Sequence, residues 1–173
     1  MIRIALLGCG RISKNHIETI KQLEAEGKAR LVATCDCVPE RTETAARAAG
    51  PGVTAFTDYR QMLDSADCDM VSICTPSGLH PLHVGMAAQA GKHVLSEKPS
   101  GTKLAEVDKA IEACDRAGVK YFVVKQNRFN KTVQLARKAL EAGRFGRISM
   151  ILSNVLWTRP QDYYDQAKWR GTW

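Results

Sequence analysis

Short apolar runs alternate with amphipathic segments along most of this chain, and this alternation limits the possible folds more than any other feature. The apolar runs are too short for helices and carry few polar side chains, which is typical of parallel strands buried on both faces. The segments between them repeat apolar residues every three or four positions and end at glycine, as helices do. We expect strands over 3–7, 31–35, 53–56, 70–74, 93–96 and 121–124, with helices over 14–26, 39–49, 59–63, 80–90 and 104–117.

This order of elements predicts an α/β fold with a doubly wound parallel sheet, that is, a Rossmann dinucleotide-binding fold. Right-handed crossovers between such strands favour the strand order 3-2-1-4-5-6. We place this domain at residues 1–126. After it, the sequence predicts a helix over 131–142, a longer strand over 147–157 and a polar, aromatic loop over 161–173. We assign residues 127–173 to the start of a truncated second α+β domain.

Composition excludes several classes of protein. No apolar run approaches the length that spans a bilayer, and the amino terminus is too short for a signal peptide, so we expect a cytoplasmic protein with no membrane partner. The six cysteines form neither Cys-x2-Cys pairs nor clusters with histidine at zinc spacing. We therefore predict reduced thiols and no metal site.

The net charge of +7 comes from one segment of the chain. Between residues 120 and 147 eight basic residues are opposed only by Glu141, while basic and acidic residues cancel elsewhere. No nucleic-acid-binding motif accompanies the segment, and we expect no nucleic-acid partner. Two interpretations remain, a solvated helix face and a positive field that attracts an anionic small substrate.

A glycine-rich turn follows the first predicted strand. Its sequence, from Gly8 to Ser13, has the pattern G-x-G-x-x-S. Gly8 permits the tight turn, and Gly10 lets a pyrophosphate approach the backbone at the amino terminus of the next helix. The turn therefore predicts a dinucleotide site at Gly8, Gly10, Arg11 and Ile12.

Asp36 ends the second predicted strand, where it can accept hydrogen bonds from an adenosine ribose. Its charge would repel a 2′-phosphate, so the sequence favours NAD over NADP. Arg41 lies close enough along the chain to leave NADP as an alternative. A purely structural role for Asp36, as a cap of the helix that begins at Pro39, is also open.

Two polar segments follow the fourth and sixth strands, at the same edge of the predicted sheet. Thr75, Pro76, Ser77 and His80 lie at the topological switch point, where ligands bind in such folds. We expect His80 to touch the nicotinamide half of the cofactor, unless it only starts a helix. The polar segment 126–128 belongs either to the site or to an ordinary turn.

The tripeptide Glu97-Lys98-Pro99 follows the fifth strand. Lysine avoids burial, so a lysine between a carboxylate and a proline at the end of a buried strand needs a partner or a task. Pro99 predicts a rigid bend, which a cis peptide bond could form. Such a bend would aim the ammonium of Lys98 into a cleft. The alternative is a solvated lysine in a surface turn.

Taken together, these motifs resemble the Gfo/Idh/MocA family of oxidoreductases. The resemblance rests on Gly8-x-Gly10, on Thr75-Pro76 with His80, and on Gly91-Lys92-His93 with Glu97-Lys98-Pro99. Residues 124–128, 158–165 and 169–173 look like the branch that oxidises the C3 hydroxyl of UDP-N-acetylglucosaminuronic acid (UDP-GlcNAcA). The resemblance implies an NAD-dependent sugar dehydrogenase that acts in polysaccharide biosynthesis and is a homo-oligomer when complete.

The resemblance also implies roles for single residues. Lys98 would contact the hydroxyl that is oxidised and assist its proton loss, and Glu97 and Lys98 would line the nicotinamide site. Asn127 would approach the cofactor, and Trp169 with Arg170 would close over it. The substrate would be a small sugar nucleotide, whose diphosphate and carboxylate fit the basic segment. Its expected ligands are Lys98, Arg128, Arg159 and Tyr163.

One feature of the family is missing from this chain. The helix with an Asp/Asn-x-x-x-His motif, which supplies the family's catalytic histidine, does not occur, and none of the four histidines lies in such a context. We therefore expect the amino-terminal part of a dehydrogenase, whose own activity is open. The alternatives are a non-catalytic module that binds NAD or a nucleotide sugar, and another reaction of the family on a sugar or cyclitol.

Overall fold

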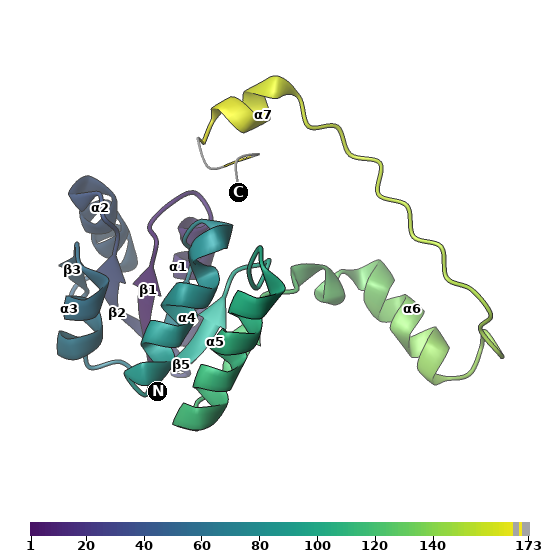
Figure 1. Ribbon diagram of the computed structural model, residues 1–173, viewed down its shortest axis with the longest axis horizontal. Coiled ribbons are helices and arrows are strands. Elements are labelled where there is room, and N and C mark those ends of the chain that lie inside the picture. The colour runs from purple at the N-terminus through teal and green to yellow at the C-terminus, as the bar shows by residue number, and fades with distance from the viewer. Residues whose placement is uncertain (168–169, 171–173) are drawn as a thin grey trace. The chain divides into compact units, whose positions relative to one another are not determined.

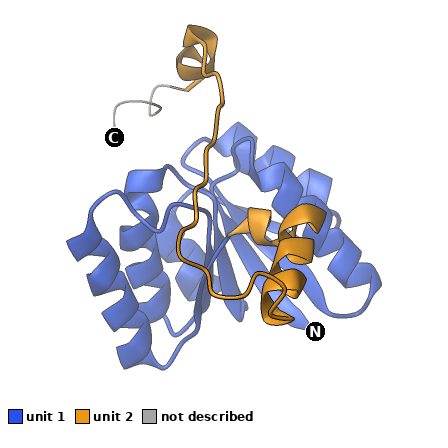
Figure 2. Cartoon of the chain, turned by 90° about the vertical axis from the view of Figure 1, so that its right-hand side faces the viewer, with its two compact units in different colours: residues 1–124 blue, residues 125–173 orange. Residues whose placement is uncertain are grey.

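The structure is a computed structural model that describes residues 1–167 and residue 170. It divides the chain into two compact units, Met1–Val124 and Lys125–Trp173 (Figure 2). The division falls after Val124, two residues before the boundary that we predicted after residue 126. The two units are considered separately.

The first unit is built on one parallel sheet, labelled in part in Figure 1. Its six strands have the order β3-β2-β1-β4-β5-β6, which confirms the predicted doubly wound α/β fold. The carboxyl ends of all strands therefore meet at one edge of the sheet. The strands are β1 (Ile2–Leu7), β2 (Ala29–Cys35), β3 (Thr54–Phe56), β4 (Met70–Ile73), β5 (His93–Ser96) and β6 (Tyr121–Val123).

Helices cover both faces of this sheet, because successive side chains of a strand point to opposite sides. In β1, Ile4 and Leu6 pack in the cluster formed with α1 and α2, whereas Ala5 and Leu7 pack in the cluster formed with α3, α4 and α5. This burial on both sides explains why β1 is apolar almost throughout. The helices are α1 (Ser13–Ala25), α2 (Pro39–Ala49), α3 (Tyr59–Ser65), α4 (His80–Gln89) and α5 (Leu104–Ala117), and a short 3₁₀ turn, η1 (Ser77–Leu79), precedes α4.

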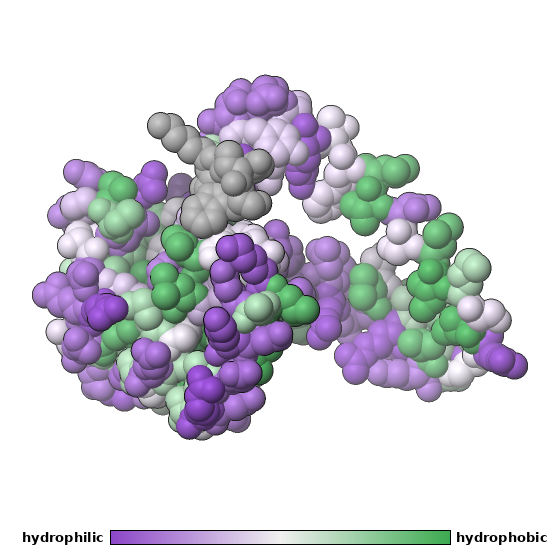
Figure 3. Space-filling view, viewed as in Figure 1, coloured by the Kyte–Doolittle hydropathy of each residue, from purple (hydrophilic) through white to green (hydrophobic). Residues whose placement is uncertain are grey.

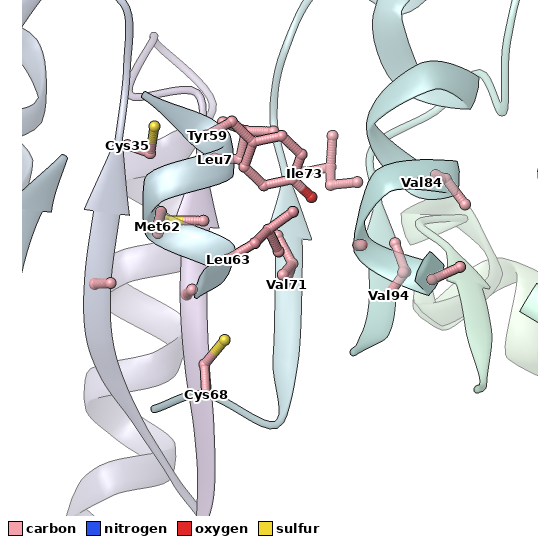
Figure 4. Packing of buried hydrophobic residues seen from close by; sticks show 14 of the residues in the cluster. Leu7, Cys35, Tyr59, Met62, Leu63, Cys68, Val71, Ile73, Val84 and Val94 are labelled. Carbon is pink, nitrogen blue, oxygen red and sulfur yellow. The ribbon is translucent and has the colours of Figure 1, made fainter. Parts of the chain in front are cut away.

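The larger of the two clusters is shown in Figure 4, where side chains of α3 face residues of β1 and β4. Met62, Val71 and Ile73 are fully buried in it. Each such side chain stabilises the fold by about 1.5–3 kcal/mol relative to exposure. The hydroxyl of Tyr59 donates to the carbonyl of His83 at 3.1 Å, so this polar group is satisfied inside the apolar layer.

The second unit contains the short 3₁₀ turn η2 (Gln126–Phe129) and the helices α6 (Lys131–Glu141) and α7 (Gln161–Asp165). The predicted strand over 147–157 is wrong, because this segment forms no strand and its large apolar side chains are exposed. Figure 3 shows hydrophobic side chains along the chain between α6 and α7. A strand needs a neighbour for its backbone hydrogen bonds, and the described residues of this unit include no other strand.

The start of the segment 161–173, for which we predicted a loop, instead forms the helix α7. Its helix is short, and the side chains of Gln161 and Asp165, one turn apart, share a hydrogen bond of 2.9 Å. The remainder of this loop lies partly outside the described residues, and so does Trp169.

The described residues contain no membrane-spanning helix, no disulfide and no metal-binding cluster. No helix over residues 1–167 is long and apolar enough to cross a membrane. All six cysteines, which lie between Cys9 and Cys114, are free thiols. No group of histidine, cysteine, aspartate and glutamate side chains in the described part of the chain is placed to hold a metal ion.

Candidate dinucleotide site

The glycine-rich turn is held between the ends of neighbouring strands. Gly8 has φ of +89°, and a Cβ atom there would lie 2.8 Å from the backbone of Cys74 and 2.9 Å from the nitrogen of Thr75. Its N–H donates to the carbonyl of Cys35 at 2.8 Å. Only glycine suits this position, because both the backbone conformation and the close approach to the turn after β4 exclude a side chain.

The next part of the turn is open and offers hydrogen-bond donors. A Cβ atom on Gly10 would meet nothing within 4 Å. Helix α1 begins here without a side-chain cap, beside the exposed Arg11 and Ile12. The N–H groups of Ser13 and Asn15 already donate to the carbonyls of Gly10 and Ile12, so a ligand would meet the other N–H groups of this turn. Ser13 is buried and donates its hydroxyl to the carbonyl of Gly10 at 2.5 Å. An uncapped helix start beside unfilled space fits a pyrophosphate group.

Asp36 is tied to this turn by its side chain. One carboxylate oxygen accepts from the N–H of Cys9 at 2.8 Å, and the other accepts from the N–H of Val38 at 3.0 Å. Val38 is the N-cap residue of α2 and makes no capping hydrogen bond with its own side chain, so the carboxylate of Asp36 also supports the start of that helix through the N–H of Val38. The oxygen bound by Cys9 keeps a further lone pair for a ribose hydroxyl, whereas the other oxygen also accepts a weak hydrogen bond from the thiol of Cys37 at 3.8 Å. The residue is partly exposed.

His80 lies inside the protein, away from the open side of the predicted site. It is only 1% exposed. Its Nδ1 is 2.6 Å from the carbonyl oxygen of Pro99, and its Nε2 is 2.7 Å from the carbonyl oxygen of Thr75. The structure therefore does not offer His80 as a contact for the nicotinamide, because both ring nitrogens and the whole ring are enclosed. Instead the ring joins the turn after β4 to the turn after β5.

A second histidine braces the same turn from α4. Nδ1 of His83 is 3.0 Å from the hydroxyl of Thr75, and its ring packs edge to face against Tyr59. Burial, with a smaller contribution from the neighbouring His80, lowers the pKa of His83 to about 4. The neutral ring thus holds Thr75, while Thr75, Pro76 and Ser77 remain partly exposed at the switch point.

Glu97 and Lys98 differ sharply in their surroundings. Glu97 is 9% exposed, whereas Lys98 is exposed, and the peptide bond between Lys98 and Pro99 is cis. The carboxylate of Glu97 lies 3.0 Å from Nε2 of His16 and accepts from the N–H of Lys98 at 3.2 Å. Burial raises the pKa of Glu97, but the hydrogen bonds from His16 and Lys98 outweigh it, and the pKa lies below its ordinary value.

His16 and Ser72 are residues of this edge that the sequence analysis missed. Nδ1 of His16 is 2.9 Å from the hydroxyl of Ser72, and its Nε2 faces Glu97. Two signals point to them. Ser72 is a polar residue inside the apolar run of β4, and His16 follows the buried Ser13 by three positions on α1, so that both lie on the inner face of the helix.

In the second unit, two residues of the predicted site, Arg159 and Arg170, lie on the aromatic ring of a third, Tyr163. The guanidinium groups of Arg159 and Arg170 lie 4.7 Å and 4.3 Å from the ring centre of Tyr163, and Arg159 is also 4.8 Å from the ring of Trp157. Arg170 donates to the carbonyl of Tyr163 at 2.6 Å. Two cations on one ring form a compact positive site. Asn127 and Arg128 are exposed in η2.

A family model and several solved structures match this chain. A family model described as "Oxidoreductase family, NAD-binding Rossmann fold" (GFO_IDH_MocA) matches residues 2–125. The chain is 52% identical to the WlbA dehydrogenase from Bordetella pertussis, solved in complex with NADH and UDP-GlcNAcA, with a TM-score of 0.92. It is 43% identical to the WlbA dehydrogenase from Chromobacterium violaceum, solved with the same two ligands, again with a TM-score of 0.92.

A curated relative with a different name is also similar. D-apiose dehydrogenase from Paraburkholderia graminis is 34% identical over 142 residues, which is 82% of this chain. The match covers 37% of that enzyme. The structural matches cover 98% of this chain but 51% and 48% of the two WlbA dehydrogenases. The chain thus spans about half the length of those proteins.

Proposed function

This chain belongs to the Gfo/Idh/MocA oxidoreductase family, and on that premise we propose that it is the cofactor-binding part of an NAD-dependent sugar-nucleotide dehydrogenase. The proposed reaction is oxidation of the C3 hydroxyl of UDP-GlcNAcA. The observation that carries this proposal is the 52% identity, over 98% of the chain, to a dehydrogenase solved with NADH and UDP-GlcNAcA. The edge of the sheet supports it, because the turn, the acid and the exposed lysine follow the carboxyl ends of β1, β2 and β5.

The residues of the first unit would hold the cofactor in distinct ways. The open backbone at Gly10, with Arg11 and Ile12 at the uncapped start of α1, would bind the pyrophosphate. Asp36 would accept the ribose hydroxyls and exclude a 2′-phosphate. Thr75, Pro76 and Ser77 would line the nicotinamide half. Bound NAD supplies the hydride acceptor of the reaction.

Lys98 is the proposed catalytic residue. Its side chain is exposed at the carboxyl end of β5, while the neighbouring carboxylate of Glu97 is turned inward to His16. The ammonium therefore remains free to approach a sugar hydroxyl, polarise it and assist the loss of its proton. Asn127 and Trp169 keep their proposed roles beside the cofactor, which follow from the family resemblance.

The proposed substrate is an anion. UDP-GlcNAcA carries a diphosphate and a carboxylate, and among its expected ligands in the second unit Arg159 stacks on the ring of Tyr163, while Arg128 is exposed in η2. Arg170 keeps its proposed role of closing over the cofactor with Trp169. Arginine is well suited to such groups, because its planar fork can bind two oxygens at once. We also infer a homo-oligomer for the complete protein, since the exposed apolar segment 148–157 favours burial against further protein.

The cofactor assignment is tested by calorimetry of NADH and NADPH with the chain and its Asp36→Ala variant. We expect the unmodified chain to prefer NADH. Asp36→Ala should weaken NADH binding by about tenfold or more, because hydrogen bonds to a charged group are lost, and should reduce the preference. Tighter binding of NADPH by the unmodified chain would contradict the assignment.

A matched control comes from Asp58, another aspartate of the first unit. Its carboxylate accepts from the N–H of Gln61 at 2.8 Å and caps α3. Asp58→Ala should lower the unfolding free energy by about 1 kcal/mol without changing the affinity for NADH. An equal loss of affinity in both variants would mean that Asp36 acts only through stability.

The reaction is tested in the protein purified from its source. UDP-GlcNAcA should drive the formation of NADH, and Lys98→Ala should lower kcat by about 10²–10⁴-fold, the usual cost of removing a general acid or base. UDP-N-acetylglucosamine, which lacks the carboxylate, should be a poor substrate. Equal turnover of both sugar nucleotides would point to another reaction of the family, and binding of NADH without turnover of either would favour a non-catalytic module.

A further inference from the structure

A chain of hydrogen bonds connects a helix and two strands of the first unit. His16 comes from α1, Ser72 from β4 and Glu97 from the end of β5. Nδ1 of His16 is 2.9 Å from the hydroxyl of Ser72, and Nε2 is 3.0 Å from Oε1 of Glu97. Residues 16 and 97 are thus joined side chain to side chain, although they lie far apart in the sequence.

The chemistry of these groups sets the direction of the hydrogen bonds. An ionised carboxylate only accepts, so Nε2 of His16 must carry the proton that faces Glu97. In a neutral imidazole this leaves Nδ1 as the acceptor for the hydroxyl of Ser72. In an imidazolium both nitrogens donate, and the contact with Glu97 is retained. The link between His16 and Glu97 therefore persists in either state of the ring.

Glu97 is also anchored at its backbone. Its N–H donates to the carbonyl of Ile73 at 2.9 Å, and its carbonyl accepts from the hydroxyl of Ser96 at 3.0 Å. Its second carboxylate oxygen accepts from the N–H of Lys98 at 3.2 Å. The orientation of the Glu97 carboxylate and the position of the Lys98 backbone are therefore set together.

We propose that His16, supported by Ser72, is a positioning residue that holds the Glu97 carboxylate away from the Lys98 ammonium and so keeps this lysine available at the site. This inference rests on the proposed function only for the task of Lys98. The contacts among His16, Ser72 and Glu97 stand without it.

His16 and Lys98 compete for the carboxylate of Glu97. The ammonium of Lys98 is close enough for its charge to lower the pKa of Glu97, and the charge of His16 acts in the same direction. A buried carboxylate without a partner is costly, so the loss of His16 would turn Glu97 toward the ammonium of Lys98. Lys98 would then be held in an ion pair with its neighbour and withdrawn from the substrate.

Cys74 is the remaining titratable group that faces Glu97 and Ser72. Burial, followed by the charge of Glu97, raises the pKa of the Cys74 thiol well above its ordinary value, while a hydrogen bond with Ser72 opposes this. The thiol stays protonated at neutral pH and does not supply a competing charge. His16 and Lys98 are thus the two groups whose interactions lower the pKa of this carboxylate.

The test follows the carboxyl carbon of Glu97 by ¹³C NMR during a pH titration of the full chain, with its signal assigned by Glu97→Gln. The variants are His16→Leu, which removes the hydrogen bonds, and His16→Gln, which keeps an N–H near the position of Nε2. We expect the titration midpoint of Glu97 to rise in His16→Leu and to return toward the original value in His16→Gln. The affinity for NADH should fall by up to about tenfold in His16→Leu, because the displaced Glu97 and Lys98 are the residues expected to line the nicotinamide site.

His93 supplies the matched control. Its Nδ1 accepts from the N–H of Lys120 at 3.1 Å at the start of β5, the opposite end of that strand from Glu97. His93→Leu should leave the titration of Glu97 and the affinity for NADH unchanged. If His16→Leu does not fold, Ser72→Ala gives the same test, because it removes the group that orients the ring and should move the Glu97 midpoint in the same direction.

The outcomes separate this inference from the proposed function. An unchanged Glu97 midpoint in a folded His16→Leu or Ser72→Ala variant would overturn the positioning role, whatever the affinity for NADH. A raised midpoint, restored by His16→Gln, would support the role even if the unmodified chain bound no NADH. That last result would refute the proposed function alone.

Discussion

The two units of this chain bury their apolar side chains to very different degrees. In the first unit, both faces of the sheet are covered, and residues such as Val71 and Val84 are fully enclosed. In the second unit, Leu152 and Leu156 are 80% and 94% exposed, and none of the residues in α6 is buried. The first unit therefore has its own hydrophobic core, whereas the described part of the second has apolar side chains without such a core.

The second unit also teaches which patterns can fold alone. Its helix over Lys131–Glu141 forms as predicted, although its apolar residues are exposed, because a helix satisfies its backbone hydrogen bonds within one segment. The predicted strand over 147–157 does not form, because a strand needs a neighbour for the same bonds. In the second unit, an apolar pattern is therefore sufficient evidence for a helix but insufficient for a strand.

The largest expected effect tests the contrast in burial directly. Val71 lies at 0% exposure in the central strand β4 and Leu156 lies in the exposed segment, and we would replace each with glutamate. Val71→Glu should lower the unfolding free energy by more than about 4 kcal/mol, because it buries an unpaired charge. Leu156→Glu should change it by less than about 0.5 kcal/mol. Urea unfolding followed by circular dichroism measures both.

The same pair of variants also tests the exposed segment by its effect on association. Leu156→Glu should reduce self-association in light scattering, because it places a charge within an apolar surface. A destabilisation comparable to that of Val71→Glu would contradict the comparison between the units, since it would mean that Leu156 is buried.

A smaller effect is expected within the first unit, at two glycines of one turn. Gly8→Ala should lower the unfolding free energy by about 2 to 4 kcal/mol, because a Cβ atom there is strained and would lie 2.8 Å from the backbone of Cys74. Gly10→Ala should leave stability nearly unchanged, because its Cβ would meet nothing within 4 Å. It should instead weaken NADH binding by about tenfold, since it fills the approach to the backbone.

Unfolding curves and calorimetry on the two glycine variants separate these effects. A folded Gly8→Ala chain of normal stability would show that the turn can relax, and unchanged NADH binding by Gly10→Ala would place the pyrophosphate elsewhere.

The smallest effect concerns pH and the histidine that braces Thr75. The pKa of His83 falls from 6.5 to about 4 on folding, chiefly because the ring is buried. The unfolded chain therefore binds the proton first, and this contribution to stability is complete above pH 6.5 and is lost as the pH falls toward 4. Between pH 7 and pH 5 we expect a loss of about 1 to 2 kcal/mol, at 1.4 kcal/mol per pH unit.

The matched variant is His83→Asn, which keeps a polar group near Nδ1 but does not titrate. The difference in unfolding free energy between pH 7 and pH 5 should shrink in this variant by the amount expected for His83. An identical pH dependence in both chains would show that the ring is protonated inside the folded protein. Glu97 affects stability in a lower pH range. Its pKa is lowered on folding, so it contributes stability above pH 4.5 that is lost on further acidification.

The positions of the site residues followed from the sequence, but the directions of several side chains did not. The carboxyl ends of parallel strands meet at one edge, which was enough to place Gly10, Asp36 and Lys98 together. His80 belongs to the polar segment that was predicted after the fourth strand, yet its ring is buried in the protein and contacts the turns after β4 and β5. His16 belongs to none of the predicted site motifs, and its contact with Glu97 depends on how α1 packs over the sheet.

The sequence by itself determined which elements of the first unit form, their order in the sheet and the edge where polar residues gather. These properties follow from local hydrogen bonding, from the period of the apolar residues and from the handedness of crossovers. Only the tertiary structure decided which polar side chains turn inward, as His16 and His80 do, and which remain exposed, as Lys98 does. It also left the segment 147–157 without strand structure. Both outcomes depend on partners far away in the sequence, because a buried polar group and a strand backbone each need a hydrogen-bond partner that no local pattern can supply.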